Sequence, residues 1–335
     1  MINITNPESL SLSGLGIHTG IPCTISFQKS QLGNLTGDNS SSFHSSIRFP
    51  KNTSTDSTSE LFKTSELSTT SKPSSPKETS STNIASTAWQ TLNLSDLGAI
   101  PRRAAYSTIL VGPDFSMRTP EHLFAALLFF PDSEIVINCI AEELPFLDGS
   151  ALPYAEVLSS LFPSSNPRIW REYATDLIWE KVWENGFIRV KPAEHFKVVY
   201  HLQRFELNQN LAIETPEEVW NGILPARSFA FFSEWKNAAK NSTMAGADGQ
   251  GGILLAENPN QYIKAKQQFP QFQTGDYPLL HPQALRFNDE PIRHKILDLI
   301  GDLALLRLAL PKLEIEIQNG GHWVHHELMD KLTLN

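Results

Sequence analysis

One stretch of the chain constrains the fold more than any other, because it must be buried and yet carries ionisable side chains. Residues 291–310 (PIRHKILDLIGDLALLRLAL) place apolar side chains almost all the way around a predicted helix. Asn288 or Asp289 can serve as its N-cap, and Pro291 fits its first turn. We therefore expect a long and largely buried helix here.

On this helix, His294 and Asp298 are four positions apart and point in the same direction. A buried carboxylate without a partner is costly, so Asp298 needs a compensating group. A divalent metal held by His294, Asp298 and a third residue from elsewhere would supply it. A buried His–Asp hydrogen bond without metal is the alternative, and from the spacing alone that simpler interpretation is favoured.

Length and composition indicate a globular protein of two domains. The chain has 335 residues, of which 40% are hydrophobic and 10% aromatic. We find no run long enough to span a bilayer and no secretory signal at the N-terminus. Cys23 and Cys139 match no metal or redox spacing, so we expect buried free thiols in a reducing cytoplasm. The net charge of −9 argues against a nucleic-acid partner, although a few local Lys and Arg could grip a small phosphorylated ligand.

A segment at about 50–88 differs from the rest because it is rich in Ser and Thr and poor in apolar residues. Such a segment cannot bury enough surface to offset its ordering entropy, and we predict a flexible surface insertion. A phosphorylated regulatory segment is the less favoured alternative.

Periodicity and turn signals predict a similar order of strands and helices in the two halves of the chain. In the N-terminal half we expect a hairpin at 11–28, a helix at 120–130 capped by Thr119, a half-buried strand at 133–143 and a helix from Pro153. In the C-terminal half we expect strands at 178–192 and 195–207, a helix at 227–239, the long helix, a strand at 313–318 and a helix at 325–332. This order predicts an α+β fold with two similar domains, 1–165 and 166–335, although no residue-by-residue repeat is evident.

Glu121 and His122 lie in the first turn of the helix predicted at 120–130, where the helix dipole favours an ionised carboxylate. Charge complementation of the helix end explains both residues without any catalysis, and it is favoured if the motif is taken alone. A glutamate beside a histidine is also what a hydrolytic metal site needs, namely a ligand and a base for water.

Six segments in this order together resemble a known enzyme family. They are GLGIHTG (14–20), TPEHLFAAL (119–127), ELPFLDGSALPYAEVL (143–158), ARSFAFF (226–232), LRFNDEPIRHKILDLIGDLALL (285–306) and GGH (320–322). In these segments the chain resembles the zinc-dependent UDP-3-O-acyl-N-acetylglucosamine deacetylases, which perform the committed step of lipid A synthesis in Gram-negative bacteria. The resemblance covers most of the chain outside the Ser/Thr-rich segment.

The resemblance implies one Zn²⁺ per chain, bound by His122, His294 and Asp298 with a fourth position left for water. Fe²⁺ suits two histidines and one carboxylate equally well. Glu121 would be the general base that takes the proton of the attacking water. We expect two similar domains, each a β-sheet packed against α-helices in a duplicated two-layer sandwich, with the active site between them.

Further residues acquire roles only through the resemblance. His322 would be cationic and stabilise the oxyanion, and Asp302 would orient it. Lys295 would contact the substrate near the scissile bond, and Phe229 would contact its sugar or uracil. Ser228 stands where the family has threonine and keeps the hydroxyl that donates to the oxyanion. Taken alone, His322 would be interpreted as an exposed turn histidine, Asp302 and Lys295 as solvated charges, and Phe229 as a core residue.

The expected function is therefore hydrolysis of the N-acetyl group of UDP-3-O-acyl-N-acetylglucosamine by a cytoplasmic monomer, which releases acetate and a free amine. Departures from the family pattern motivate an alternative; they lie at Ser228, at 248–252 within the loosely matching stretch 244–257, and at 323–325. This alternative is a catalytically silent paralogue that binds a UDP-sugar or a lipid. A zinc amidase for another N-acetyl sugar is a third possibility. We expect Asp148 and Gly149 to hold a structural turn.

Overall fold

A computed structural model describes most of the chain. The described residues are 3–6, 9–29, 46–50, 89–93, 100–104, 107–111, 116–130, 135–139, 141–163, 169–240, 251–268, 276–280 and 283–334. The insertion predicted at 50–88 lies outside them apart from Pro50, and so does the first half of the stretch 244–257.

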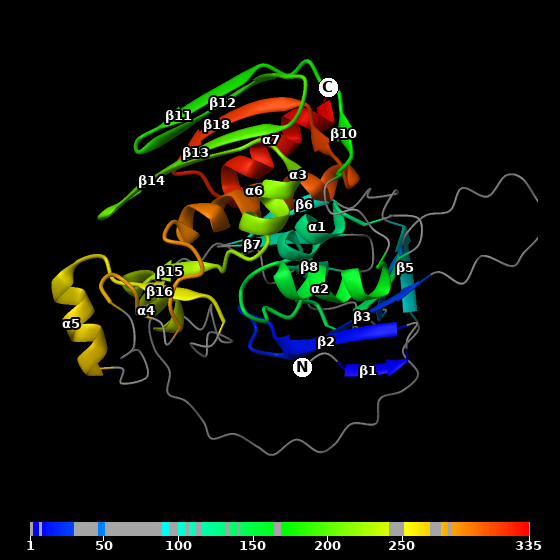
Figure 1. The fold of residues 1–335 in the computed structure, drawn as a ribbon, viewed down its shortest axis with the longest axis horizontal. Helices are drawn as coiled ribbons and strands as arrows, with labels where there is room; N and C mark the ends of the chain where they lie inside the picture. The colour runs from blue at the N-terminus through cyan, green and yellow to red at the C-terminus, as the bar shows by residue number, and fades with distance from the viewer. Residues whose placement is uncertain are drawn as a thin grey trace, which may run out of the picture.

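Two large β-sheets form outer layers, and helices lie between them, so the protein has a mixed α+β fold (Figure 1). The six-stranded sheet consists, in spatial order, of β1 (Asn3–Asn6), β2 (Ser9–Leu15), β3 (Pro22–Lys29), β9 (Ile135–Cys139), β4 (Ser46–Pro50) and β5 (Trp89–Asn93). The five-stranded sheet consists of β11 (Trp179–Trp183), β12 (Gly186–Pro192), β18 (Leu313–Gln318), β13 (Lys197–Arg204) and β14 (Leu207–Ile213). Neighbouring strands are antiparallel except for β4–β9 and β13–β18, which are parallel.

Smaller elements complete the fold. The minor sheets are β6 (Ile100–Ala104), β7 (Ser107–Val111) and β8 (Ser116–Arg118); β10 (Glu172–Tyr173) with β17 (Leu310–Pro311); and β15 (Phe229–Phe231) with β16 (Ile253–Leu255). The helices are α1 (Glu121–Leu127), α2 (Leu152–Leu161), α3 (Pro216–Glu218), the π-helix η4 (Val219–Ile223), α4 (Phe232–Lys240), α5 (Pro259–Gln268), α6 (Glu290–Arg307) and α7 (His322–Leu334). Among the described helices, none is both long and apolar enough to cross a bilayer.

Strands form in the predicted segments, because apolar alternation decides which face of each strand is buried. The segment 178–192, predicted as one strand, is a hairpin of two, β11 and β12. In β18, Leu313, Ile315 and Ile317 are fully buried, whereas the intervening polar side chains are half-buried. The predicted hairpin is formed by β2 and β3, and β9 pairs with β3. The two cysteines are buried free thiols, as predicted, and burial raises the pKa of Cys139 to about 11.

The long helix is α6, and most of its side chains are buried, as its sequence predicts. It packs directly against α1, and Gly301 is the point of closest approach. A Cβ atom at Gly301 would lie 2.1 Å from the backbone oxygen of Glu121, so only glycine permits this separation. This contact brings the first turn of α1 alongside the middle of α6.

Several local predictions are wrong. The helix predicted at 120–130 is α1, which ends at Leu127. Thr119 does not cap α1: the N-cap position is Pro120, and the Thr119 hydroxyl lies 3.4 Å from a Glu143 carboxylate oxygen, to which it donates. The segment predicted as a helix at 227–239 begins as strand β15, because Phe229–Phe231 finds a parallel partner in β16. The long helix ends at Arg307 rather than 310, since Leu308 adopts a left-handed conformation (φ 47°). The last helix begins at His322, three residues earlier than predicted.

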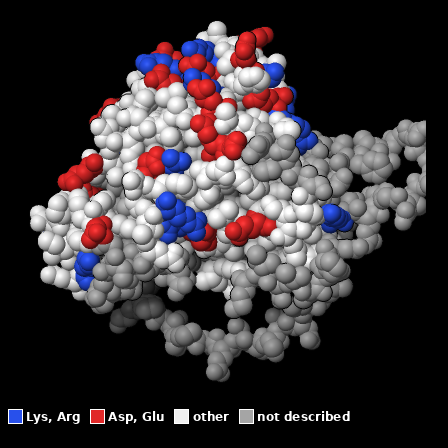
Figure 2. Space-filling model, viewed as in Figure 1, with Lys and Arg blue, Asp and Glu red and all other residues white. Residues whose placement is uncertain are grey.

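The outer face of the five-stranded sheet carries basic and acidic side chains that pair with one another. Arg189 contacts Glu180 and Glu316, and Lys191 contacts Glu314. Figure 2 shows basic and acidic side chains mixed at the top of the molecule, where Figure 1 places β11, β12 and β18. Paired charges on this face do not form the basic stripe that a nucleic-acid interface requires.

Candidate active site and metal-binding group

A cavity of about 1110 Å³ opens where α1, α6 and the start of α7 meet the ends of the five-stranded sheet. The predicted site residues that line it are Glu121, His122, Ser228, Phe229, His294, Lys295, Asp298 and His322. Asp302 lies one helical turn beyond Asp298 and reaches the cavity only through His322. The structure therefore brings together residues as far apart in the sequence as Glu121 and His322, which are separated by 201 positions.

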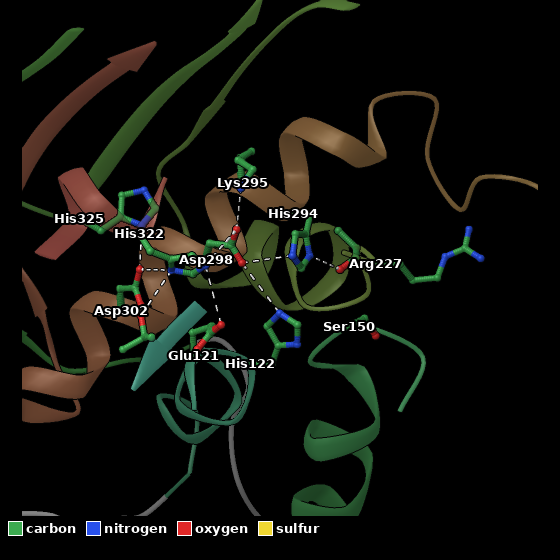
Figure 3. Close-up of polar contacts among 12 residues, drawn as sticks. Glu121, His122, Ser150, Arg227, His294, Lys295, Asp298, Asp302, His322 and His325 are labelled. Atoms are coloured by element: carbon green, nitrogen blue, oxygen red, sulfur yellow. Dashed lines mark hydrogen bonds and ion pairs between the residues drawn. The ribbon is translucent and has the colours of Figure 1, made fainter. Parts of the chain in front are cut away.

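Three side chains that could hold a metal ion converge at the base of this cavity (Figure 3). They are His122, His294 and Asp298, and together they form the candidate metal-binding group. His294 Nε2 lies 3.1 Å from Asp298 Oδ1, and His122 Nε2 lies 3.9 Å from the same oxygen. One ligand atom from each residue falls within 4.8 Å of the others. His294 Nδ1 donates to the Ala226 carbonyl at 3.1 Å, which leaves the Nε2 lone pair directed at the group.

The protonation states of this group suit a metal ion. Burial and the neighbouring His294 lower the pKa of His122 to about 3, so its imidazole is neutral at pH 7. Burial alone would raise the pKa of Asp298, but His294, Lys295 and His322 outweigh it and hold this pKa well below its usual value. The neutral imidazole of His122, the imidazole of His294 and the ionised carboxylate of Asp298 converge in a buried pocket, and this set of side chains fits a divalent ion such as Zn²⁺ or Fe²⁺.

Glu121 lies beside the metal-binding group and has a perturbed carboxyl. Its side chain is buried, and within the described part of the chain its Oε2 atom has no hydrogen-bond partner. Burial raises its pKa to about 8; the cation of His322 opposes this rise, and the charges of Asp302 and Asp298 add to it. A carboxyl with a pKa near neutrality is suited to take up and release a proton at working pH.

His322 is the first residue of α7, and its imidazole faces the carboxylates of the site. Its Nδ1 donates to Asp302 Oδ2 at 2.8 Å, while Nε2 lies 3.8 Å from Glu121 Oε1 and 3.9 Å from Asp298 Oδ2. Burial alone would lower the pKa of His322, but Asp302 and Asp298 outweigh it and raise this pKa to about 10. His322 is therefore a cation at pH 7.

The remaining predicted residues lie along the cavity wall. Lys295 Nζ is 3.0 Å from Asp298 Oδ2 and 5.7 Å from the centroid of the Phe229 ring. Ser228 and Phe229 are half-buried. Asp148 accepts hydrogen bonds from the backbone and hydroxyl of Ser150, which is the structural turn that the sequence predicts.

Sequence reasoning missed Glu143, which fixes the loop of the GLGIHTG segment at the cavity. Its buried carboxylate accepts hydrogen bonds from the backbone N–H groups of His18 and Thr19 and from the Thr19 hydroxyl. A Cβ at Gly16 would lie 2.2 Å from this carboxylate, so a larger residue there would displace the carboxylate or the loop. Ile17 and His18 of the same loop line the cavity. The only signal in the sequence was an acidic residue at the start of a matched segment.

Sequence reasoning also missed a buried ion pair that anchors the start of α6. Arg227 donates to both carboxylate oxygens of Glu290, through Nε at 2.8 Å and Nη2 at 3.0 Å. The backbone N–H groups of Arg227 and Arg286 donate to the same carboxylate. Because Glu290 is one turn before His294, this pair sets the position of the first candidate ligand on α6.

Comparison with known proteins agrees with this geometry. Residues 61–269 and 272–334 match the LpxC family model, described as UDP-3-O-acyl N-acetylglycosamine deacetylase. Among relatives with the name UDP-3-O-acyl-N-acetylglucosamine deacetylase, that of Thermodesulfovibrio yellowstonii is 28% identical over 68% of this chain and 72% of its own length. The Coxiella burnetii protein is 28% identical over 72% and 77%, and that of Thermosynechococcus vestitus 29% identical over 66% and 71%. The chain therefore belongs to the LpxC family of deacetylases.

Proposed function

We propose that this protein hydrolyses the N-acetyl group of UDP-3-O-acyl-N-acetylglucosamine with the help of one bound Zn²⁺, as a step of lipid A biosynthesis. The observation that carries the proposal is the convergence of His122, His294 and Asp298, with Glu121 and His322 beside them in one cavity. The names of the relatives supply the substrate.

His122, His294 and Asp298 would hold the ion. A divalent ion there would polarise the amide carbonyl and make a neighbouring water more acidic. Glu121 would accept a proton from the water whose oxygen bonds to the carbonyl carbon. Its buried carboxyl has no competing partner on Oε2 within the described residues, so it is available for this transfer.

His322 would complete the reaction as an acid. Its cation would stabilise the negative oxygen that develops on the carbonyl, and a proton would pass to the nitrogen as the C–N bond breaks. Acetate and the free amine are the products. Ser228 would donate its hydroxyl to the same oxygen, and Lys295 and Phe229 would contact the sugar part of the substrate.

The architecture around the site carries further proposals. We propose that residues 1–165 and 166–335 are two similar domains, each a sheet packed on helices as a two-layer sandwich, with the site between them. The ligands come from both, His122 from one and His294 with Asp298 from the other. We also propose that the protein is a monomer and that it is cytoplasmic. Its two buried cysteines are free thiols, which suits a reducing compartment.

One observation favours a second candidate, a silent paralogue that binds a UDP-sugar or lipid without turnover. Trp323, where the family has a small residue, directly follows His322 and lines the cavity. Turnover by purified protein decides between the two. Release of acetate from the UDP-linked substrate supports the enzyme, and binding without release supports the paralogue. Release only from other N-acetyl sugars would assign a different amidase.

The decisive experiment combines metal analysis with that assay in Glu121→Gln. This variant should retain about one zinc per chain and the wild-type unfolding midpoint, yet lose activity by about 10²- to 10⁴-fold, because general base catalysis contributes that much. Stripping zinc from the wild-type protein with a chelator should abolish activity, and returning Zn²⁺ should restore it. If Glu121→Gln loses zinc and fold together, Glu121 is structural and the mechanism is wrong.

A further inference from the structure

Helix α7 carries three histidines behind the site, of which two contact one buried carboxylate and the third reaches it through Thr108. His322, His325 and His326 are at positions i, i+3 and i+4 and therefore share one face of the helix. His322 Nδ1 and His325 Nδ1 each lie 2.8 Å from Asp302 Oδ2. Asp302 is fully buried and is held ionised: burial would raise its pKa, but the contacts with His322 and His325 lower it. Both imidazole nitrogens must therefore carry a proton and donate it to this oxygen.

The other oxygen of Asp302 is occupied by a residue from β7. The Thr108 hydroxyl donates to Asp302 Oδ1 at 2.6 Å. Because its one proton is used there, Thr108 Oγ1 must accept at its other short contact, from His326 Nε2 at 2.8 Å. A directed chain thus runs from His326 through Thr108 to Asp302, and all three residues are buried.

These contacts account for the orientation of His322. Asp302 receives donors on both oxygens from two different elements, so its carboxylate cannot turn without breaking at least one short hydrogen bond. With Asp302 fixed, the His322 ring is fixed through Nδ1, and its Nε2 points at Glu121 and Asp298 in the cavity. Figure 3 shows His325 and His322 both beside the Asp302 carboxylate, with Asp298 on the opposite side of His322 from Asp302.

His325 is not explained by packing alone. Its side chain is fully buried, and its Nε2 has no hydrogen-bond partner among the described residues. An unsatisfied buried nitrogen lowers stability, and a leucine in the same place would avoid that cost. What the imidazole offers and leucine lacks is the Nδ1–H donor to Asp302.

We propose that His325 and Thr108 are positioning residues that act through Asp302 to aim His322 at the substrate. The proposal rests on the proposed deacetylase function and deepens it. Neither residue lines the cavity, so neither is expected to touch the substrate. They should therefore affect the rate of the chemical step rather than substrate binding.

Pairs of substitutions separate the effect of losing the hydrogen-bond donor from the effect of changing the size of the side chain. His325→Asn keeps an N–H donor at the same number of bonds from the backbone, whereas His325→Leu removes it. Thr108→Ser keeps the hydroxyl, and Thr108→Val removes it with little change in volume. The matched controls are His195→Asn and His195→Leu, since the His195 side chain is 74% exposed and contacts only Glu172 among the pairs described.

The first readout is steady-state kinetics on zinc-loaded protein. His325→Leu and Thr108→Val should each lower kcat by about 10- to 100-fold with KM within about twofold of wild type, as is usual for partners of an active-site group. His325→Asn and Thr108→Ser should retain most of kcat, and the His195 variants all of it. Two outcomes overturn the proposal. One is an equal loss of kcat in the donor-free variant and in its conservative partner, and the other is wild-type kcat in both His325→Leu and Thr108→Val.

The second readout does not depend on activity. In proton NMR the His322 Nδ1–H bonded to Asp302 should give a downfield resonance, assigned by its absence in His322→Gln. This resonance should shift or broaden in His325→Leu and Thr108→Val and persist in their conservative partners; no change in the donor-free variants overturns the proposal. If wild-type protein fails to release acetate, the proposed function fails, and this readout still decides whether the residues position His322.

Discussion

Gly301→Ala tests whether the contact between α1 and α6 builds the site. The added Cβ would lie 2.1 Å from the backbone oxygen of Glu121, 2.7 Å from its carbonyl carbon and 2.9 Å from its Cα. All three atoms are backbone atoms, so no side-chain rotation can relieve the contact. Relief requires α1 to move away from α6, and Glu121 and His122 move with it.

The size of that movement follows from the distances. Ordinary contact begins at 3.4 Å, so α1 must retreat by about 1 Å in a core that is closely packed. Alanine favours a helix over glycine by about 0.5–1 kcal/mol, whereas overpacking costs about 1–3 kcal/mol, so stability should fall by about 1–2 kcal/mol. Metal ligands tolerate only about 0.2 Å, and a 1 Å misplacement at a reacting centre costs about 100-fold in rate.

The assay compares zinc affinity, kcat and urea unfolding in Gly301→Ala with those in Gly222→Ala. At Gly222 the added Cβ meets only the flexible guanidinium of Arg293, so that variant reports helix preference without displacing α1. We expect weaker zinc binding and at least a tenfold loss of kcat in Gly301→Ala alone. If Gly301→Ala binds zinc as tightly as wild type and turns over at the same rate, the helix contact does not position the site.

Three further predictions follow from buried groups. Arg227→Met should lower the free energy of unfolding by about 3–5 kcal/mol in urea titrations, because it leaves the buried Glu290 carboxylate without its cation. Adding Glu290→Leu removes that charge, so the double variant should recover most of the lost stability. Glu143→Gln should raise KM more than it lowers kcat, since an amide cannot accept all the donors of the loop at 16–20. The pH profile of kcat/KM should be bell-shaped: activity falls as pH drops through the pKa of Glu121, about 8 without an ion and lower beside one, because the base must be ionised. It falls again as pH rises through that of His322, about 10, because the acid must be protonated; a profile without the alkaline fall would refute this role.

The spacing of apolar and polar residues predicted the features that depend on the period of a helix or a strand. The i, i+4 spacing put His294 and Asp298 on one face of the long helix, and their nitrogen and oxygen atoms are 3.1 Å apart. The apolar circumference of the same stretch predicted its burial. The alternation in β18 predicted which face of that strand packs inward.

What the sequence pattern could not supply is the partner of a polar group in another element. Thr108 and Asp302 are 194 positions apart, and Glu143 is 125 positions from His18. Periodicity reports that a side chain is buried but not what it meets. Thr119 shows how such a contact overrides a local rule, because its hydroxyl donates to Glu143 instead of capping α1.

Three carboxylates within one small region of the protein have been given different environments, and this difference assigns their roles. Asp302 has donors on both oxygens and stays ionised, so it can only hold and orient. Asp298 faces the imidazoles of the metal-binding group with one oxygen and Lys295 with the other, so it also stays ionised and can serve as a ligand. Glu121 alone has an oxygen without a described partner, and its pKa is raised to about 8. Environments that separate the pKa values of neighbouring acids identify which of them exchanges protons, and this difference supports the proposal that Glu121 acts as the base.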